Sequence, residues 1–196
     1  EYLNVNVKKV LWIYYEGNDL SNLEKEIEDK ILINYLEDKT FNQNLKSRQN
    51  EINMMVKKLL DKKEFSFDLV KIIKFYNLRK LLNLSKEPPP GFEPSPPKQF
   101  KKILKLAKDL TEKNNSKLYF VYLPEYNRYK TKYDDTNYNL IKNIITKLDI
   151  PFIDIHNEIF KKEQSPTRLF PFKSYGHFNK EGYKKVATTI YKLTLN

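Results

Sequence analysis

Three short runs of consecutive apolar residues stand out along the chain, and each has the length of a β-strand. They cover residues 10–15, 118–123 and 151–155. The second run ends at Pro124, and the third opens with a proline. Because these runs are apolar at successive positions instead of alternating, they predict strands that are buried on both faces of a parallel sheet.

Apolar residues at helical spacing lie between and after these runs. The segments around residues 100–110, 138–148 and 183–191 each carry apolar side chains three and four positions apart, which is typical of helices that pack on a sheet. Strands that alternate with helices indicate βαβ units with right-handed crossovers. The sequence therefore predicts an α/β fold with a parallel sheet in a single domain over residues 1–196.

Residues 20–85 have a different character. Ser21 and Glu24 form a capping-box pattern, and apolar residues recur at helical spacing through residues 52–59 and 69–76. We interpret this interval as a helical insertion over the sheet. Residues 86–98 are rich in proline and predict an extended, polyproline-like connector. We interpret the connector as a surface excursion within the domain, and a domain boundary there is the alternative.

Composition narrows the class of protein. The chain has 196 residues, of which 40% are hydrophobic, and this is enough apolar material for one core. It has no cysteine, which excludes disulfides, thiolate metal sites and a cysteine nucleophile. No segment approaches the ~20 consecutive apolar residues that span a bilayer.

The net charge is +11, which by itself suggests binding to nucleic acid or another anionic surface. Only Arg48, Arg79, Arg128 and Arg168 of the 36 basic residues are arginine, however, and the lysines are scattered along amphipathic segments. Proteins that read bases and phosphates depend on arginine for bidentate contacts. We therefore expect solvated lysine-rich faces, and nucleic acid is not the expected partner.

Polar residues follow each predicted strand, at the edge where open α/β sheets bind their ligands. Glu125 follows the second strand, and Asp154 with His156 ends the third. After the first come Gly17, Asn18 and Asp19: a glycine permits a sharp turn, an asparagine amide can donate to an oxyanion, and an aspartate can brace the loop through backbone N–H groups. A simple turn that caps the next helix is the alternative.

A second group of polar residues lies at 174–183, directly before the last helical segment, and contains His177. A histidine in a turn beside a helix start can take a proton from a hydroxyl and return it to a leaving group. His156 is the other histidine of the chain, and we expect it to cap a helix or lie at the surface.

Taken together and in this order, the two groups resemble the motifs of the SGNH/GDSL hydrolase family. The resemblance implies a three-layer α/β/α fold of flavodoxin-like type, with Asn18 as a donor of the oxyanion hole and His177 as the general base. Four further residues match the flanking pattern of these motifs: Asp19, Asn179, Gly182 and Tyr183. The specific content amounts to two short motifs near the two ends of the chain.

The chain departs from the family pattern at two points. The Gly-Asp-Ser block that carries the nucleophile in the family would precede Gly17 and is not among residues 1–16. We therefore expect a domain truncated at its N-terminus, with the serine upstream of Glu1. Ser174 stands where the family has an aspartate three residues before the histidine, so that a backbone carbonyl or another carboxylate, such as Asp154, would orient His177.

The resemblance implies acyl transfer through a serine ester, with no metal and no organic cofactor. It suggests a small acyl ester on a carbohydrate or lipid as substrate, in a bacterial protein that is extracytoplasmic or anchored to a membrane through a missing N-terminal segment. Two alternatives remain at this point. One is a scaffold whose site has decayed, and the other is a basic module that binds glycan or nucleic acid through residues 126–133, whose more expected place is the mouth of the cleft.

Overall fold

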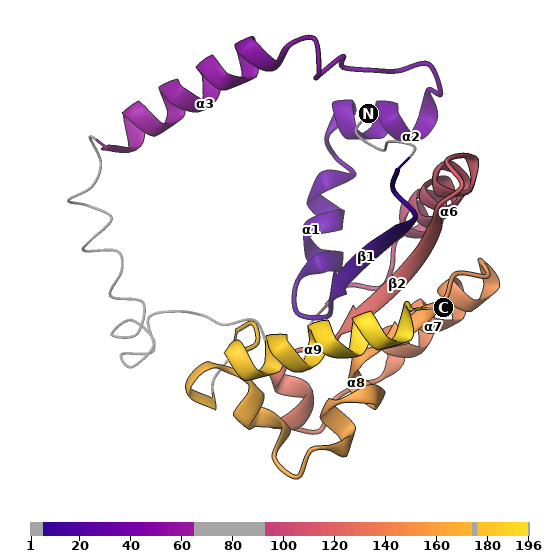
Figure 1. Ribbon diagram of the computed structural model, residues 1–196, viewed down its shortest axis with the longest axis vertical. Helices are drawn as coiled ribbons and strands as arrows, with labels where there is room; N and C mark the ends of the chain where they lie inside the picture. Colours follow the sequence, from indigo (N-terminus) through magenta and orange to yellow (C-terminus); the bar gives the residue numbers. More distant parts are fainter. Residues whose placement is uncertain (1–5, 65–92, 174–175, 196) are drawn as a thin grey trace. The chain divides into compact units, whose positions relative to one another are not determined.

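The computed structural model describes residues 6–64, 93–173 and 176–195 (Figure 1). The chain divides into two compact units. One contains Thr40–Pro89, and the other contains Leu3–Lys39 together with Pro90–Asn196. The second unit holds the sheet and both candidate motifs.

The sheet has three strands, β1 (Lys9–Tyr15), β2 (Lys117–Leu123) and β3 (Phe152–Asp154), in the order β1-β2-β3. All pairs are parallel, with Tyr15 opposite Leu123 at the carboxyl end of β1. This confirms the α/β fold with a parallel sheet. The third strand ends one residue earlier than predicted, because residue 155 already begins a helix.

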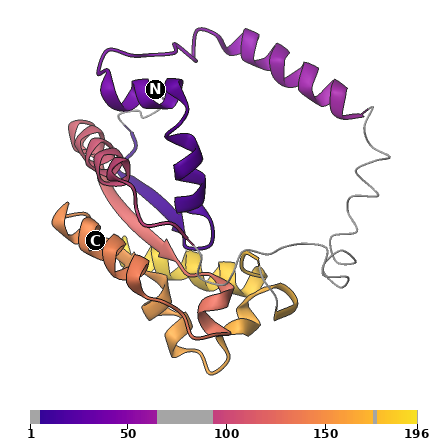
Figure 2. The same cartoon turned by 180° about the vertical axis from the view of Figure 1, so that it is seen from behind.

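One face of the sheet is covered by α1 (Asp19–Glu26), α6 (Lys98–Lys113) and α7 (Thr136–Lys147) (Figure 2). The amphipathic pattern of α6 and α7 explains this placement, because each turns its apolar stripe toward the strands. The core on this side consists of Tyr14, Leu20, Phe100, Leu104, Leu118, Phe120, Tyr122, Ile141, Ile145 and Ile150.

The other face is covered by α8 (Ile155–Glu158), by α9 (Lys180–Leu193) and by short 3-10 turns between them. These turns are η1 (Tyr126–Tyr129), η2 (Phe160–Lys162), η3 (Pro166–Leu169) and η4 (Pro171–Lys173). Aromatic rings dominate this second core, which includes Tyr15, Tyr119, Val121, Tyr126, Ile153, Phe160, Leu169, Phe170, Phe178 and Val186. Helices therefore pack on both faces of the described sheet.

The prediction that the first strand is buried on both faces is wrong at two alternate positions, which lie on one face. Leu11 is 40% exposed and Ile13 is 46% exposed. Within the described residues β1 pairs with β2 alone, so that it is an edge strand and these side chains remain partly open to solvent. Residues Tyr14 and Tyr15, at its carboxyl end, are buried.

The capping box predicted at Ser21 and Glu24 is also wrong. Helix α1 begins at Asp19, with Asn18 at the N-cap position, so Ser21 lies inside the helix. The cause is the Asp19 carboxylate, which accepts a hydrogen bond from the backbone N–H of Tyr15 (2.8 Å) and ties the helix start directly to the strand.

The interval predicted to be helical contains two more helices in its described part. Helix α2 (Lys30–Glu37) belongs to the unit of the sheet and is capped by Asp29, which accepts from the N–H of Ile31 (2.8 Å). Helix α3 (Gln49–Glu64) belongs to the other unit. Residues 65–92, which include the expected helix at 69–76 and most of the proline-rich connector, lie outside the described residues. No helix in the described ranges is long and apolar enough to cross a membrane.

Candidate active site

The loop that follows β1 is short and tightly determined. The N–H of Glu16 still donates to the carbonyl of Leu123 (2.9 Å), so the sheet ladder extends one residue past the strand. A Cβ on Gly17 would lie 2.5 Å from the Tyr15 ring, which leaves room for glycine alone. Asn18 is exposed, and its side chain makes no capping hydrogen bond to α1. Its amide is therefore not used to close the helix.

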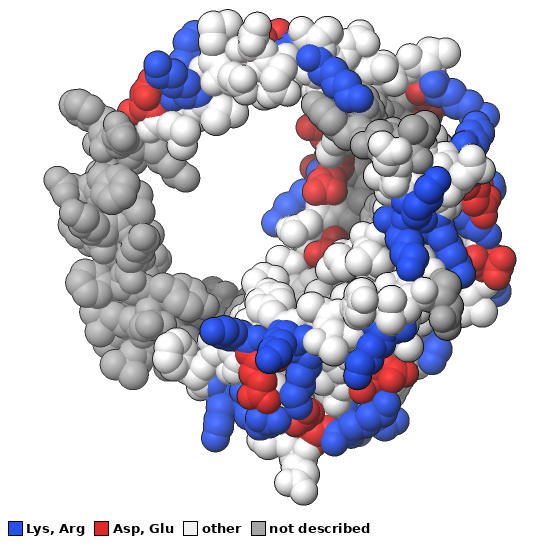
Figure 3. Space-filling model, in the orientation of Figure 1, with Lys and Arg blue, Asp and Glu red and all other residues white. Residues whose placement is uncertain are grey.

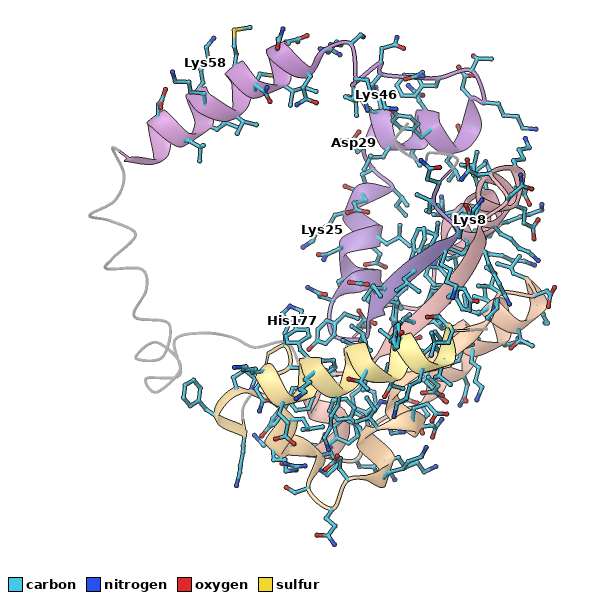
Figure 4. The ribbon with its side chains drawn as sticks, in the orientation of Figure 1. Lys8, Lys25, Asp29, Lys46, Lys58 and His177 are labelled. Atoms are coloured by element: carbon cyan, nitrogen blue, oxygen red, sulfur yellow. The ribbon has the colours of Figure 1, made fainter. Side chains whose placement is uncertain are left out.

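His177 comes from the other end of the chain and lies at the same edge of the sheet. Its ring packs against the ring of Tyr15, with centroids 4.5 Å apart and planes tilted by 49°. The Tyr15 hydroxyl also donates to the carbonyl of Gly176 (3.1 Å), 161 residues away in the sequence. In Figure 4 the imidazole lies beyond the end of β1, between the loop that leads into α1 and the start of α9.

The two motifs are coupled electrostatically as well as by packing. Burial raises the pKa of Asp19 above its usual value, and the hydrogen bond from the Tyr15 N–H opposes this effect. The charge of Glu26 adds to the rise, whereas a positive charge on His177 lowers the pKa of Asp19. The carboxylate that braces the Asn18 loop therefore interacts electrostatically with the His177 segment.

Residues around the start of α9 hold His177 in place. Asn179 caps the helix, because its Oδ1 accepts from the N–H of Gly182 (2.9 Å). Its Nδ2 donates to the carbonyl of Arg168 (2.7 Å). A Cβ on Gly182 would lie 2.7 Å from the carbonyl oxygen of Leu169, so the helix can approach this closely only with glycine. The family-like pattern around His177 therefore has a structural basis in this chain.

Neither side chain considered for orienting the imidazole, Ser174 or Asp154, is placed beside it by the described residues. Ser174 lies outside the described residues. Asp154 accepts from the Tyr138 hydroxyl (2.6 Å) and from the N–H of Asn157 (3.1 Å), so its carboxylate is engaged at β3 and α8. The structure does not place Asp154 beside His177, and Asp19 is the carboxylate that interacts with its charge.

His156 is an internal histidine. It lies in α8, and its Nδ1 forms a hydrogen bond with the Tyr129 hydroxyl (2.8 Å). Burial lowers the pKa of His156, and the neighbouring charge of Arg128 lowers it further. The neutral ring is therefore favoured as a member of the aromatic core.

A buried ion pair that sequence reasoning missed lies next to the candidate site, with Glu16 directly before Gly17. The side chains of Glu16 and Arg128 are each 5% exposed. Arg128 Nε donates to both carboxylate oxygens of Glu16, at 2.8 and 3.1 Å, and the Tyr122 hydroxyl and the Glu125 N–H donate to the same carboxylate. Arg128 is one of only four arginines in a lysine-rich chain, and this rarity is the signal that could have identified the pair, because a planar guanidinium suits buried bidentate contacts.

Residues 126–133 are expected from the sequence to line the mouth of a cleft. In the structure Tyr133 lines a cavity at the carboxyl edge, whereas Tyr126 and the Arg128 side chain are buried. Arg128 is buried, the Tyr126 hydroxyl donates to the carbonyl of Lys173 (2.6 Å), and the Tyr133 hydroxyl donates to Glu125 (2.7 Å). Tyr126 and Arg128 lie in the turn η1, which directs them inward after β2. Lys and Arg are interspersed with Asp and Glu on the face drawn in Figure 3. A basic module built on this segment is therefore not favoured.

Two cavities bear on the location of chemistry. One of about 490 Å³ lies at the amino end of the strands, between Lys117, Phe152 and Lys108. A smaller one of about 150 Å³ lies at the carboxyl edge, lined by Tyr14, Glu16, Glu93 and their neighbours. The smaller cavity lies at the edge where open parallel sheets bind their ligands, and neither Asn18 nor His177 is among the residues that line it. No group of three or more metal-ligating side chains occurs in the part of the chain that the structure describes.

Comparison with protein-family models, with curated proteins and with solved structures finds no match for this chain.

Proposed function

We propose that this chain supplies the oxyanion donor and the general base of an SGNH/GDSL-type serine ester hydrolase or O-acyltransferase with a three-layer α/β/α fold. One observation carries the proposal: Tyr15 joins the Asn18 loop to the His177 segment at the carboxyl edge of the sheet, across 161 residues of sequence. An oxyanion donor and a catalytic base must act on one reacting group, and a common edge of the sheet supports such an arrangement.

The reaction follows from these two groups. A serine hydroxyl attacks the carbonyl carbon of the ester while His177 takes its proton, and Asn18 donates a hydrogen bond to the oxygen that becomes negative. The tetrahedral intermediate collapses, the C–O bond to the alcohol breaks, and His177 returns the proton to the departing alkoxide. Water or a sugar hydroxyl then accepts the acyl group in a second cycle of the same steps.

The nucleophile is the element that the proposal places outside these 196 residues. An oxyanion donor and a base without a serine cannot form the acyl-enzyme that divides the reaction into two easier steps. The substrate of the proposal is a small acyl ester on a carbohydrate or lipid, and neither a metal ion nor an organic cofactor takes part in these steps.

A fluorophosphonate probe tests the proposal, because it labels serines that a base activates. The 196-residue chain should give no labelling and negligible hydrolysis of p-nitrophenyl acetate. A longer protein in which a Gly-Asp-Ser segment precedes these residues should give both. His177→Ala should abolish labelling, and Asn18→Ala should slow turnover by roughly 100-fold, as for other single oxyanion donors. The matched control is His156→Phe, which alters the other histidine and should leave labelling intact.

Stoichiometric labelling of the 196-residue chain itself would show that one of its own serines is the nucleophile, and the upstream serine would have to be abandoned. An upstream segment without any activated serine would leave a catalytically inactive scaffold as the better account.

A further inference from the structure

Glu93 occupies an unusual place for a residue of a proline-rich segment. It lies five residues before α6, and its side chain reaches the junction between β1 and α1. Glu93 Oε2 accepts a hydrogen bond from the Tyr14 hydroxyl (2.8 Å), and Oε1 accepts from the backbone N–H of Leu20 (3.2 Å). Tyr14 is the last residue but one of β1, and Leu20 is the second residue of α1. One carboxyl group thus bridges the strand end and the helix start.

The backbone at Glu93 is itself anchored. The side-chain amide of Asn137, in α7, donates to the carbonyls of Glu93 (3.0 Å) and Pro94 (3.1 Å). The end of the proline-rich segment is therefore fixed on the same face of the sheet as α1 and α7. The last residues of this segment are packed against the sheet unit at its surface.

Two contacts close the loop that contains Asn18. The Asp19 carboxylate accepts from the N–H of Tyr15, and Glu93 links Tyr14 to Leu20. Because the Asn18 side chain makes no cap hydrogen bond, its direction depends on how firmly the backbone of this loop is held. A small displacement of a donor relative to the reacting oxygen is costly in catalysis.

We propose that Glu93 is a positioning residue: by bridging Tyr14 and Leu20 it sets the orientation of the Asn18 amide. The structural part of this inference stands on the hydrogen bonds alone, and its consequence for turnover rests on the proposed function.

The charges around Glu93 make the bridge sensitive to pH. Glu16 faces it from the end of β1 and Asp19 from α1, and the shared cavity also holds Tyr122, Tyr133 and Asp134. Burial raises the pKa of Glu93 to about 8, although the hydrogen bonds from Tyr14 and Leu20 favour the carboxylate. Repulsion from Glu16 and Asp19 adds to the rise. At neutral pH the bridging group is thus a neutral carboxyl, and at higher pH it becomes a third negative charge beside two others.

Two substitutions distinguish a protein that keeps an uncharged bridge between Tyr14 and Leu20 from one that has lost the bridge. In Glu93→Gln the amide oxygen can still accept from the Leu20 N–H, and the amide nitrogen can donate to the Tyr14 hydroxyl oxygen, so that a neutral bridge is kept with the direction of the Tyr14 hydrogen bond reversed. Glu93→Ala removes both contacts. The matched control is Glu24→Gln, which neutralises an exposed glutamate on α1 itself.

The test is NMR of the Asn18 side-chain amide and the Leu20 backbone amide in the 196-residue chain. In the unchanged chain both signals should shift with a midpoint near pH 8, since Glu93 has a pKa of about 8. Glu93→Gln should hold them at their low-pH positions at every pH, and Glu93→Ala should move them at every pH while signals from β2 and β3 stay in place. Glu24→Gln should behave like the unchanged chain.

Unaltered Asn18 signals in a folded Glu93→Ala protein would overturn the inference, and so would a pH midpoint that persists in Glu93→Gln. Turnover of the upstream-restored protein gives an independent arm. There Glu93→Ala should lower kcat by about 10- to 100-fold, and in an Asn18→Ala background it should add little, because both changes act on one donor. A positive NMR result without any turnover would refute the proposed function and leave the positioning role intact.

Discussion

Removal of the Arg128 charge should destabilise this protein more than any surface substitution of the same kind. In Arg128→Met the aliphatic stem is largely kept, but the Glu16 carboxylate loses a guanidinium that donates to both of its oxygens. Both side chains are 5% exposed, so water cannot readily replace the lost partner. Arg128 also lies over the ring of Tyr133, 4.5 Å from its centroid, and this contact is lost as well.

The magnitude can be worked from these contacts. Breaking a buried ion pair by removing one partner costs about 3–5 kcal/mol, because an uncompensated charge stays buried. Glu16 keeps two donors, the Tyr122 hydroxyl and the Glu125 N–H, which favours the lower end of this range. We expect a loss of about 3 kcal/mol in the free energy of unfolding. The double variant Glu16→Gln/Arg128→Met should lie within about 1–2 kcal/mol of the unchanged protein, since no buried charge remains.

Urea denaturation at pH 7, followed by circular dichroism, measures these differences. The control is Arg168→Met, because Arg168 also pairs with two carboxylates, of Glu163 and Glu181, but is 41% exposed. It should cost less than about 1 kcal/mol. An equal cost for the two arginine variants, or a double variant less stable than Arg128→Met alone, would refute the reasoning that burial of the pair determines its effect.

Three further outcomes follow from other features. Because Glu93 binds its proton more tightly in the folded state, its contribution to the free energy of unfolding is fully present below its unfolded pKa near 4.5 and is lost as the pH rises through about 8. The loss is at most about 5 kcal/mol. Glu93→Gln should flatten this dependence of stability on pH, as measured by thermal melts. The unchanged 196-residue chain should self-associate through its edge strand, where Leu11 and Ile13 lie partly exposed. The double variant Leu11→Thr/Ile13→Thr should reduce this self-association in analytical ultracentrifugation. A monomeric unchanged chain that melts sharply would contradict this prediction. Gly182→Ala should destabilise by about 1–3 kcal/mol in urea unfolding, because its Cβ would lie 2.7 Å from the Leu169 carbonyl; a neutral effect would show that α9 can move away.

Much of the sheet unit could be predicted from apolar patterning. The run at residues 118–123 is buried at every position, and the helical stripes before and after it pack largely as their spacing predicts, although Leu110 is 51% exposed. The meeting of Asn18 and His177 at one edge follows from the same logic, because parallel strands bring their carboxyl ends together. The catalytic roles of the two residues remain predictions.

Patterning could not reveal features that depend on partners far along the chain. Leu11 and Ile13 have the same apolar character as the residues of β2, but only the topology decides which strand lies at an edge. Glu93 and Arg128 are polar residues in segments that read as surface, and they are buried because Tyr14 and Glu16 offer them partners. No local periodicity encodes such a pairing.

The contacts of Tyr15 have a consequence for the order in which this protein folds. Its backbone N–H holds the Asn18 loop through Asp19, and its ring and hydroxyl hold the segment of Gly176 and His177. Contacts of such high sequence separation form late, because the chain loses the entropy of closing a long loop before the contact is gained. Asn18 and His177 should therefore acquire their mutual geometry only once β1, β2 and α9 have docked, and any local opening of α9 removes the histidine and loosens the strand end in a single event.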